Sequence, residues 1–405
     1  MFIKYKINSA PLSKILLLTA FVCFCICPIY AQLNAGNLIT KDTHYEIPLH
    51  HIEKEILLTA KLKGEEFTFL LDTGAPFFIS DAIQKKFNFP VIYEVKLNDA
   101  SGKEDKTVIV QIDTVSIGPF VFTNTWAVVL NMNNEAHQCH EFAGNFGSNL
   151  LQFLIVQFDL QKGKVLLSDN EKFIEKNTAP FSPAALSGQS DFTFPVRVSR
   201  NIADTILFDS GDGALYEITD EALQKIINKN ANEIIRKGRG VTSMGSLGIP
   251  ESTDQYTVKT QISFGNTTVN DGIANNTGAG QSRLGRYLLH YGALTLNYIN
   301  KQYSFKQYVN PALPEKQDFG FQIITNGKKI IAGTVWEESE AEKAGMKSGD
   351  EIISVDEVMF AELPLCDIEP AYKRVSERKE IKIQFINNIT GTKTITLAKQ
   401  DIRKL

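Results

Sequence analysis

Short apolar runs that end in an Asp-Thr/Ser-Gly turn occur twice along the chain, at residues 67–75 and 204–212. A short apolar run bounded by Gly predicts a buried strand that enters a tight turn. A stretch with helical character follows each turn, at residues 80–87 and 219–237. The second stretch opens with a capping Thr and two acids, which suit the positive end of a helix dipole.

The likeness between the two halves continues beyond the turns. Each half has, in the same order, a Gly-rich polar turn, a strand that alternates toward a Gly, an apolar-Gly element and a strand pair around a turn. The matching segments are 98–102 and 243–248, 112–118 and 260–265, 145–151 and 283–289, and 156–167 and 294–305. Residues 45–168 and 191–305 are therefore expected to be two copies of one all-β unit, joined by a linker at 169–190.

Two such turns in matching places indicate a specific chemistry. Two carboxyls that share one proton can hydrolyse a peptide bond, because the charged one takes a proton from water while the protonated one donates to the carbonyl oxygen. Asp72 and Asp209 are the candidate pair. The hydroxyls of Thr73 and Ser210 can hydrogen-bond across the interface between the turns. Two ordinary hairpin turns in a duplicated β domain are the alternative interpretation.

The repeated unit resembles the retropepsin and pepsin aspartic peptidases, and in particular bacterial retropepsin-like proteins, over residues 45–305. Asp72-Thr73-Gly74-Ala75 matches the family turn in full, and Asp209-Ser210-Gly211 matches its first three positions. The resemblance implies a mainly β fold with two pseudo-twofold-related lobes that flank a cleft, as in the bilobal acid proteases. It also implies an endopeptidase that uses no cofactor and no metal, with Asp72 and Asp209 as the catalytic pair.

The same resemblance makes the Gly-rich turns near Ser101 and Gly245 candidate flaps over an extended peptide. The sequence departs from the family pattern at Asp212, where the family has a small or hydroxyl residue. A third carboxylate there either raises the pKa values of the pair or marks a degenerate second half. An inactive peptide-binding scaffold on the same fold is therefore the alternative function, and a single working half-site that dimerises is a third.

The C-terminal region has a different pattern. Residues 306–317 contain two Pro and little periodicity, which indicates a linker. Residues 318–405 resemble the PDZ domains of exported bacterial proteases, an α+β fold, in the stretch 344–353 and in the loop Phe319-Gly320-Phe321. By that resemblance the loop amides would hold a peptide carboxylate, and a helix at 367–376 would line the groove. The alternative is a domain that only packs against the rest of the protein.

The first 31 residues predict export. Lys4, Lys6 and Lys14 precede an apolar run at residues 15–30, and Ala31 is a small residue at a plausible cleavage point. A membrane anchor is the alternative, although the run is shorter than a usual span. We therefore expect a periplasmic or extracellular protein that acts on peptides or proteins. The chain of 405 residues has a formal net charge of −4, so it lacks the positive charge that is typical of nucleic-acid-binding proteins.

Only Cys139 and Cys366 remain once the predicted signal is removed. They fall in regions assigned to different domains, so no disulfide is expected to stabilise the fold. The sequence His137-Gln138-Cys139-His140 is interpreted as a polar loop and not as a metal site, because too few further ligands accompany it.

Overall fold

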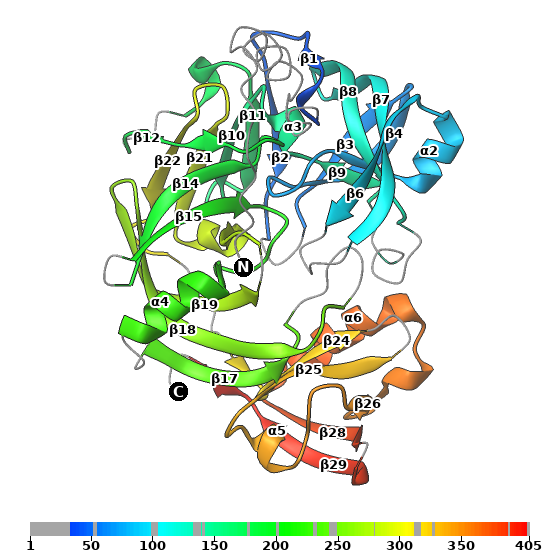
Figure 1. The fold of residues 1–405 in the computed structure, drawn as a ribbon, viewed down its shortest axis with the longest axis vertical. Coiled ribbons are helices and arrows are strands. Elements are labelled where there is room, and N and C mark those ends of the chain that lie inside the picture. Colours follow the sequence, from blue (N-terminus) through cyan, green and yellow to red (C-terminus); the bar gives the residue numbers. More distant parts are fainter. Residues whose placement is uncertain are drawn as a thin grey trace, which may run out of the picture.

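The computed structural model describes residues 33–51, 55–98, 104–132, 139, 142–175, 179–199, 202–229, 233–242, 249–278, 280–311, 317–325, 329–387 and 389–402. The fold is mainly β, as predicted, with 53% of the described residues in strands and 15% in helices (Figure 1). The predicted export signal and the tips of both candidate flaps, with Ser101 and Gly245, lie outside the described residues.

The first β unit is an eight-stranded sheet in the order β1-β8-β5-β9-β4-β3-β7-β6. Its strands are β1 (Asn37–Leu38), β3 (Leu57–Leu62), β4 (Glu65–Leu71), β5 (Phe78–Ser80), β6 (Val91–Asn98), β7 (Glu104–Ile117), β8 (Phe120–Leu130) and β9 (Gly144–Phe146). The predicted helix at 80–87 is present as α2 (Asp81–Phe87), and the Ser80 hydroxyl caps it by accepting from the Ile83 N–H. A short helix, α3 (Ser148–Leu151), follows β9.

The second β unit has strands β13 (Ala185–Leu186), β14 (Phe192–Val198), β15 (Ile202–Asp209), β16 (Tyr216–Thr219), β17 (Ile234–Gly240), β18 (Thr253–Phe264), β19 (Thr267–Gly278) and β20 (Arg283–Gly285). Its helices are α4 (Asp220–Lys229) and the 3-10 helix η4 (Arg286–His290). The prediction of one helix over 219–237 was wrong at its C-terminal end, where Ile234–Gly240 is a strand. That segment pairs with β18, so tertiary hydrogen bonds override the local helical pattern.

The two β units share one scheme of strand pairing. β4 runs parallel to β9, with Leu71 opposite Phe146, just as β15 runs parallel to β20, with Phe208 opposite Leu284. β9 also pairs antiparallel with β5, and β20 pairs in the same way with β16. Each unit adds a long hairpin, β7–β8 in the first and β18–β19 in the second. These pairings are the same in the two units, whereas the edge strands differ: β1 pairs with β8, and β13 pairs with β14.

A six-stranded sheet joins the two halves of the chain, in the order β12-β22-β21-β10-β11-β2. Its strands are β2 (His44–Pro48), β10 (Ile155–Asp159), β11 (Lys164–Ser168), β12 (Ser182–Pro183), β21 (Gly292–Asn297) and β22 (Gln302–Gln307). The segment 169–190, expected to be a linker, contributes β12 to this sheet, β13 to the second unit and the 3-10 helix η2 (Glu171–Phe173). One hydrophobic core extends through both units, and within it the rings of Phe158 and Phe208 lie 5.5 Å apart.

The C-terminal unit, residues 317–402, has its own core, which includes Phe321, Ile352 and Phe385. Its strands are β23 (Gln317–Asp318), β24 (Phe321–Thr325), β25 (Ile330–Trp336), β26 (Glu351–Val355), β27 (Val358–Met359), β28 (Glu380–Asn387), β29 (Gly391–Ala398) and β30 (Gln400–Asp401). Its helices are α5 (Glu340–Lys343), η5 (Phe360–Glu362) and α6 (Leu365–Ser376). The helix expected to line the groove is α6, with Pro370 in its first half.

This unit is attached to the second β unit through an extended sheet. β17 pairs antiparallel with β25, with Gly238 opposite Trp336, and this pairing places β17 and the C-terminal strands β24 to β29 in one 14-stranded sheet (Figure 1). The strands β23 and β30 pair with each other in a separate sheet. The buried guanidinium of Arg236 forms an ion pair with Asp318 and lies 3.8 Å from the ring centre of Trp336. The C-terminal unit is therefore joined to the body by strand pairing and by a buried charge.

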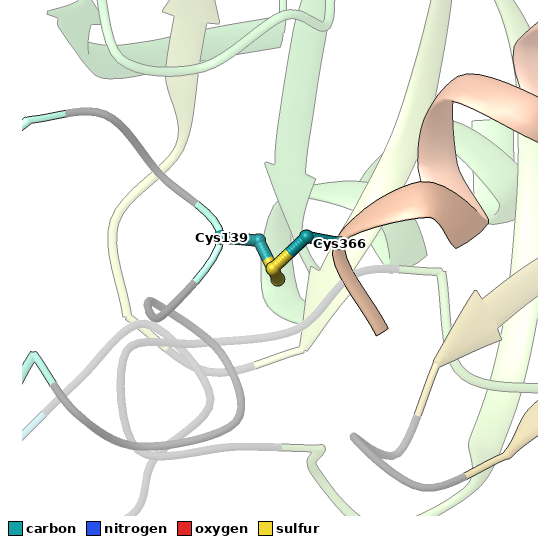
Figure 2. The surroundings of a disulfide bond; sticks show 2 residues. All are labelled: Cys139 and Cys366. Carbon is teal, nitrogen blue, oxygen red and sulfur yellow. A yellow bond between two sulfur atoms is a disulfide. The ribbon is translucent and has the colours of Figure 1, made fainter. Parts of the chain in front are cut away.

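A disulfide forms a second attachment, contrary to the expectation from the sequence. Cys139, in the loop between β8 and β9, is bonded to Cys366 in the first turn of α6 (Figure 2). The two cysteines are 227 positions apart along the chain, and only the packing of the C-terminal unit against the body brings their thiols together. The sequence therefore gave no local signal for this bond. Among the described residues, no helix is both long and apolar enough to cross a membrane.

Candidate active site

Each candidate aspartate lies where a buried strand gives way to a turn. Asp72 directly follows β4, and Asp209 is the last residue of β15. The Gly74 N–H donates to Asp72 Oδ1 over 2.8 Å, and the Gly211 N–H donates to Asp209 Oδ1 over 2.9 Å. The chain thus folds back on each aspartate, so that an amide two residues later meets its carboxylate.

The two turns hold each other through a reciprocal set of hydrogen bonds. The Thr73 N–H donates to Ser210 Oγ over 3.0 Å, and the Ser210 N–H donates to Thr73 Oγ1 over 2.9 Å. Each hydroxyl then donates across the interface to the carbonyl that precedes the other aspartate, Thr73 to Phe208 and Ser210 to Leu71, at 2.6 and 2.8 Å. Both side chains are fully buried, so these groups have no competing water.

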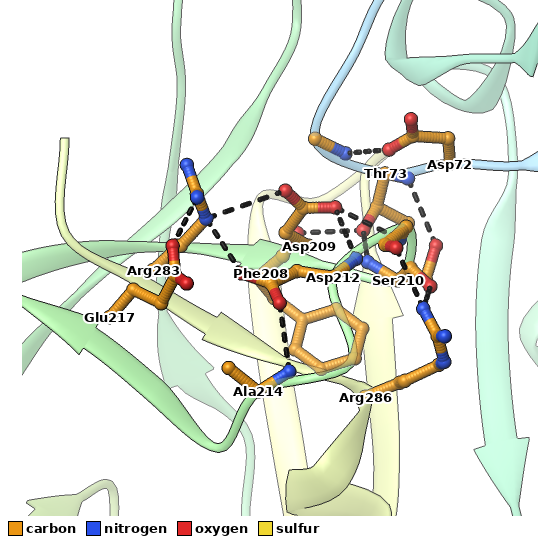
Figure 3. A network of polar contacts seen from close by, with 12 residues as sticks. Asp72, Thr73, Phe208, Asp209, Ser210, Asp212, Ala214, Glu217, Arg283 and Arg286 are labelled. Atoms are coloured by element: carbon orange, nitrogen blue, oxygen red, sulfur yellow. Dashed lines mark hydrogen bonds and ion pairs between the residues drawn. The ribbon is translucent and has the colours of Figure 1, made fainter. Parts of the chain in front are cut away.

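The side chains of Asp72 and Asp209 both lie at the interface between the turns (Figure 3), and the Asp209 carboxyl is a hydrogen-bond partner of Asp72. A Cβ atom added to Gly74 would lie 2.4 Å from Asp209 Cγ, and one added to Gly211 would lie 2.9 Å from Asp72 Cγ. Each turn therefore needs glycine at this position so that the carboxyl of the other turn can approach it. Ala75, the fourth residue of the first turn, accepts a hydrogen bond at its carbonyl from the Ser148 N–H over 2.8 Å.

The electrostatics of the two carboxyls differ. Burial raises the pKa of Asp209 well above its ordinary value, and the charges of Asp72 and Asp212 raise it further. Burial also raises the pKa of Asp72, but hydrogen bonds from the Gly74 N–H and from the Asp209 carboxyl oppose the rise. Two buried carboxyls in contact favour a state with one proton and one negative charge.

Asp212 lies beside the pair, within a charged cluster that the sequence did not predict (Figure 3). Arg283 Nε donates to Asp212 Oδ2 over 2.7 Å, and Arg283 Nη2 donates to Glu217. Asp212 Oδ1 accepts the Ala214 N–H over 2.8 Å, which shapes the end of the second turn. Asp212, which departs from the pattern of the resembled family, is therefore an ion-paired carboxylate next to Asp72 and Asp209.

Two further side chains reach the turns from neighbouring strands or helices. Asn145 on β9 donates from Nδ2 to Asp72 Oδ2 over 2.6 Å. Arg286, at the start of η4, donates from Nη1 to the Gly211 carbonyl over 2.7 Å. Sequence reasoning assigned neither residue a role. The available signal was their position in the apolar-Gly elements, where Asn145 lies two residues before Gly147 and Arg286 directly follows Gly285. Each element runs beside a strand that leads to a candidate aspartate.

The predicted peptide-binding loop of the C-terminal unit lies between β23 and β24. The side chains of Phe319 and Phe321 are buried in the core of that unit. Gly320 has φ +83°, and its N–H donates to Asp318 Oδ1 over 3.0 Å. One of the three amides expected to meet a carboxylate is therefore already engaged within the loop.

Comparison with known families identifies a match in the first β unit. Residues 58–150 match the model of a family described as aspartyl protease. The matched segment contains Asp72 and Asn145 but ends before the second turn at Asp209. No curated protein matches the chain. The first β unit is thus similar to an aspartyl protease domain.

Proposed function

We propose that this protein is an aspartic-type endopeptidase that hydrolyses peptide bonds with a water activated by Asp72 and Asp209. The observation that carries the proposal is the reciprocal hydrogen bonding of Thr73 and Ser210. These bonds hold the two turns together, so that the carboxyls of Asp72 and Asp209 lie close to each other. The family match over residues 58–150 supports the same activity. On this proposal the two β units are retropepsin-like lobes related by a pseudo-twofold axis through the paired turns.

The chemistry follows from one shared proton. The ionised carboxylate removes a proton from a water, which then attacks the carbonyl carbon of the scissile peptide bond. The protonated carboxyl donates its hydrogen bond to the carbonyl oxygen, where negative charge develops. Burial of both groups strengthens these interactions, because little bulk water screens them. The buried hydrogen bonds between the turns fix the pair, so little reorganisation accompanies the reaction.

We also propose that the C-terminal unit is a PDZ-like module that docks peptide tails by strand addition. β24 pairs with β25 along one edge, and no strand pairs with its other edge among the described residues. The side chains of Ile368 and Ala371 on α6 pack into the same core as Phe321 at the start of β24. A peptide added to this edge would lie next to α6.

Export to the periplasm or the cell exterior is part of the proposal. The predicted signal at residues 1–31 motivates it. The disulfide between Cys139 and Cys366 supports it, because such bonds persist mainly in oxidising compartments. Determination of the N-terminus of the protein from fractionated cells tests this point. An intact Met1 in the cytoplasmic fraction would contradict it.

The activity is tested by cleavage of a diverse peptide pool from about pH 3 to 8, followed by mass spectrometry. Asp72→Asn and Asp209→Asn keep the shape of each side chain but prevent proton exchange, so each is expected to reduce cleavage by at least about 100-fold. Asp113→Asn, at an exposed carboxylate on β7, is the matched control and should retain full activity. Wild-type protein that binds peptides but cleaves none at any pH would favour the inactive scaffold instead.

A further inference from the structure

Asn145 and Arg283 occupy matching positions in the two β units. Asn145 pairs with Leu70 across the parallel β4–β9 ladder, and Arg283 pairs with Leu207 across the parallel β15–β20 ladder. In each unit the paired residue stands two positions before the catalytic aspartate. The structural repeat therefore places a polar side chain at the same ladder position beside each aspartate, Asn145 near Asp72 and Arg283 near Asp209.

The two side chains act on the dyad in different ways. Asn145 is 4% exposed, and its amide donates directly to Asp72 Oδ2 over 2.6 Å. Arg283 Nε is 4.0 Å from Asp209 Oδ2 but only 2.7 Å from Asp212 Oδ2, so the guanidinium is hydrogen-bonded to Asp212 and not to Asp209. Asn145 thus donates a hydrogen bond directly to Asp72. Its counterpart Arg283 acts on Asp209 through charge, and that charge is partly offset by Asp212 and Glu217.

A hydrogen bond to a carboxylate stabilises its ionised form. Besides the Asp209 carboxyl, Asp72 accepts from the Gly74 N–H at Oδ1 and from the Asn145 amide at Oδ2. Among the described residues, the backbone N–H groups that donate to Asp209 are those of Gly211 and Asp212, and both donate to Oδ1. Oδ2 is therefore able to carry the shared proton. The donor pattern therefore favours the charge on Asp72 and the proton on Asp209.

From this geometry we infer that Asn145 and Arg283 are positioning residues that make the dyad asymmetric, with Asp72 as the base and Asp209 as the acid. Asn145 holds the negative charge on Asp72. Arg283 offsets the charges of Asp212 and Glu217, which would otherwise oppose any ionisation of Asp209. The inference rests on the proposed peptidase function for its catalytic meaning, but the asymmetry is a property of the free protein.

Other charged groups face the pair and are part of the same balance. The charges of Asp191 and Arg283 act on Asp72, besides the Asp209 carboxyl, and those of Asp72, Asp212 and Arg283 act on Asp209. The buried Tyr298 also faces this group, since the charges of Asp191, Asp72 and Asp209 raise the pKa of its phenol. Burial is the first cause of that rise, so Tyr298 stays neutral.

Asp72 and Asp209 together lose two protons in two titration steps, and each step has an apparent pKa that describes the pair. Asn145 should influence the pKa of the first step, and Arg283 that of the second. Asn145→Leu removes the donor to the charged form, so the first step should move to higher pH and kcat/KM at acidic pH should fall about tenfold or more. Arg283→Met removes the cation that pairs with Asp212 and Glu217, so the second step should move to higher pH. The acidic and basic limbs of the pH–rate profile report these steps separately.

Arg283→Lys is the matched control, because it keeps the charge and should return the basic limb toward its wild-type position. Asn145→Gln keeps an amide and should restore part of the acidic limb. Circular dichroism and thermal unfolding of each variant show whether it folds. Folded variants whose two limbs move together, or not at all, would overturn the inference.

A carboxyl titration by carbon NMR on aspartate-labelled protein separates this inference from the proposed activity. It should show two dyad steps in the wild type, the lower one raised by Asn145→Leu and the upper one raised by Arg283→Met. A wild type that cleaves nothing but shows these shifts would refute the peptidase and keep the asymmetry. Unshifted steps in an active enzyme would refute the asymmetry alone.

Discussion

The sulfur atoms of Cys139 and Cys366 are bonded across 227 residues of sequence, and they join the loop before β9 to the first turn of α6. β9 carries Asn145, which donates to Asp72, only six positions after Cys139 (145 − 139). The disulfide therefore links the C-terminal unit to a segment that contacts the candidate active site.

Loss of this disulfide should lower stability. A cross-link over a long loop restricts the unfolded chain, and its removal typically costs about 2–4 kcal/mol. The double variant Cys139→Ser, Cys366→Ser is expected to lose about that much free energy of unfolding in urea. Wild type treated with a dithiol reductant should match it, and the reductant should leave the double variant unchanged. Equal stability of oxidised wild type and double variant would contradict a structural role.

Thr73→Val should damage both fold and activity. The substitution removes the acceptor for the Ser210 N–H and the donor to the Phe208 carbonyl, both in a buried interface. Each unsatisfied buried group costs about 1–3 kcal/mol, so the loss of two should lower the free energy of unfolding by roughly 2–6 kcal/mol. Thr73→Ser keeps the hydroxyl and is the control, with an expected loss well below that of Val. The measurement is urea unfolding followed by fluorescence.

Asp209→Asn should stabilise the protein at neutral pH while it abolishes cleavage. Because burial raises the pKa of Asp209 in the folded state, the folded protein holds this proton more tightly than the unfolded chain does. Its contribution to the free energy of unfolding is therefore full below the ordinary value of 3.8 and is lost as pH rises through the folded-state pKa. The gain from Asn should appear at pH 7 and vanish near pH 3, as followed by urea unfolding across pH. A gain that is independent of pH would contradict this account.

Asp212→Ala should shift the pH–rate profile toward acid. The negative charge of Asp212 raises the pKa of Asp209, although burial is the larger cause, so its removal eases the second ionisation of the dyad. The basic limb should then move to lower pH. Asp212→Asn, which keeps an acceptor for the Ala214 N–H, should move the limb in the same direction. A limb that moves only with Ala would point to the shape of the turn as the cause.

Arg236→Met should loosen the C-terminal unit. It leaves Asp318 without its buried partner and removes the guanidinium from the face of Trp336. Breaking a buried pair at one end costs about 3–5 kcal/mol. Amide hydrogen exchange in β25 should therefore become faster. The exposed pair Lys237–Glu337, at 2.9 Å, provides the control, since Lys237→Met should cost less than about 1 kcal/mol.

The sequence by itself determined the elements that depend on local pattern. The two apolar strands with their Asp-Thr/Ser-Gly turns predicted Asp72 and Asp209 as a pair, because the same turn recurs in a repeated order of elements. The helical stretch predicted at 80–87 is present as α2, and the Ser80 cap at its start is a signal that the local sequence carries. These features are encoded within a few neighbouring residues.

Only the tertiary structure decided the contacts between distant segments. Ile234–Gly240 is a strand because β18 and β25 offer it hydrogen bonds, although its local sequence continues a helical pattern. The bond between Cys139 and Cys366 depends on how the C-terminal unit packs against the body. The donor from Asn145 to Asp72 and the ion pair between Arg283 and Asp212 likewise require strands that are adjacent in space but 73 and 71 residues apart along the chain. Local pattern carries no information about such partners, because their free energy comes from burial and pairing that exist only in the folded chain.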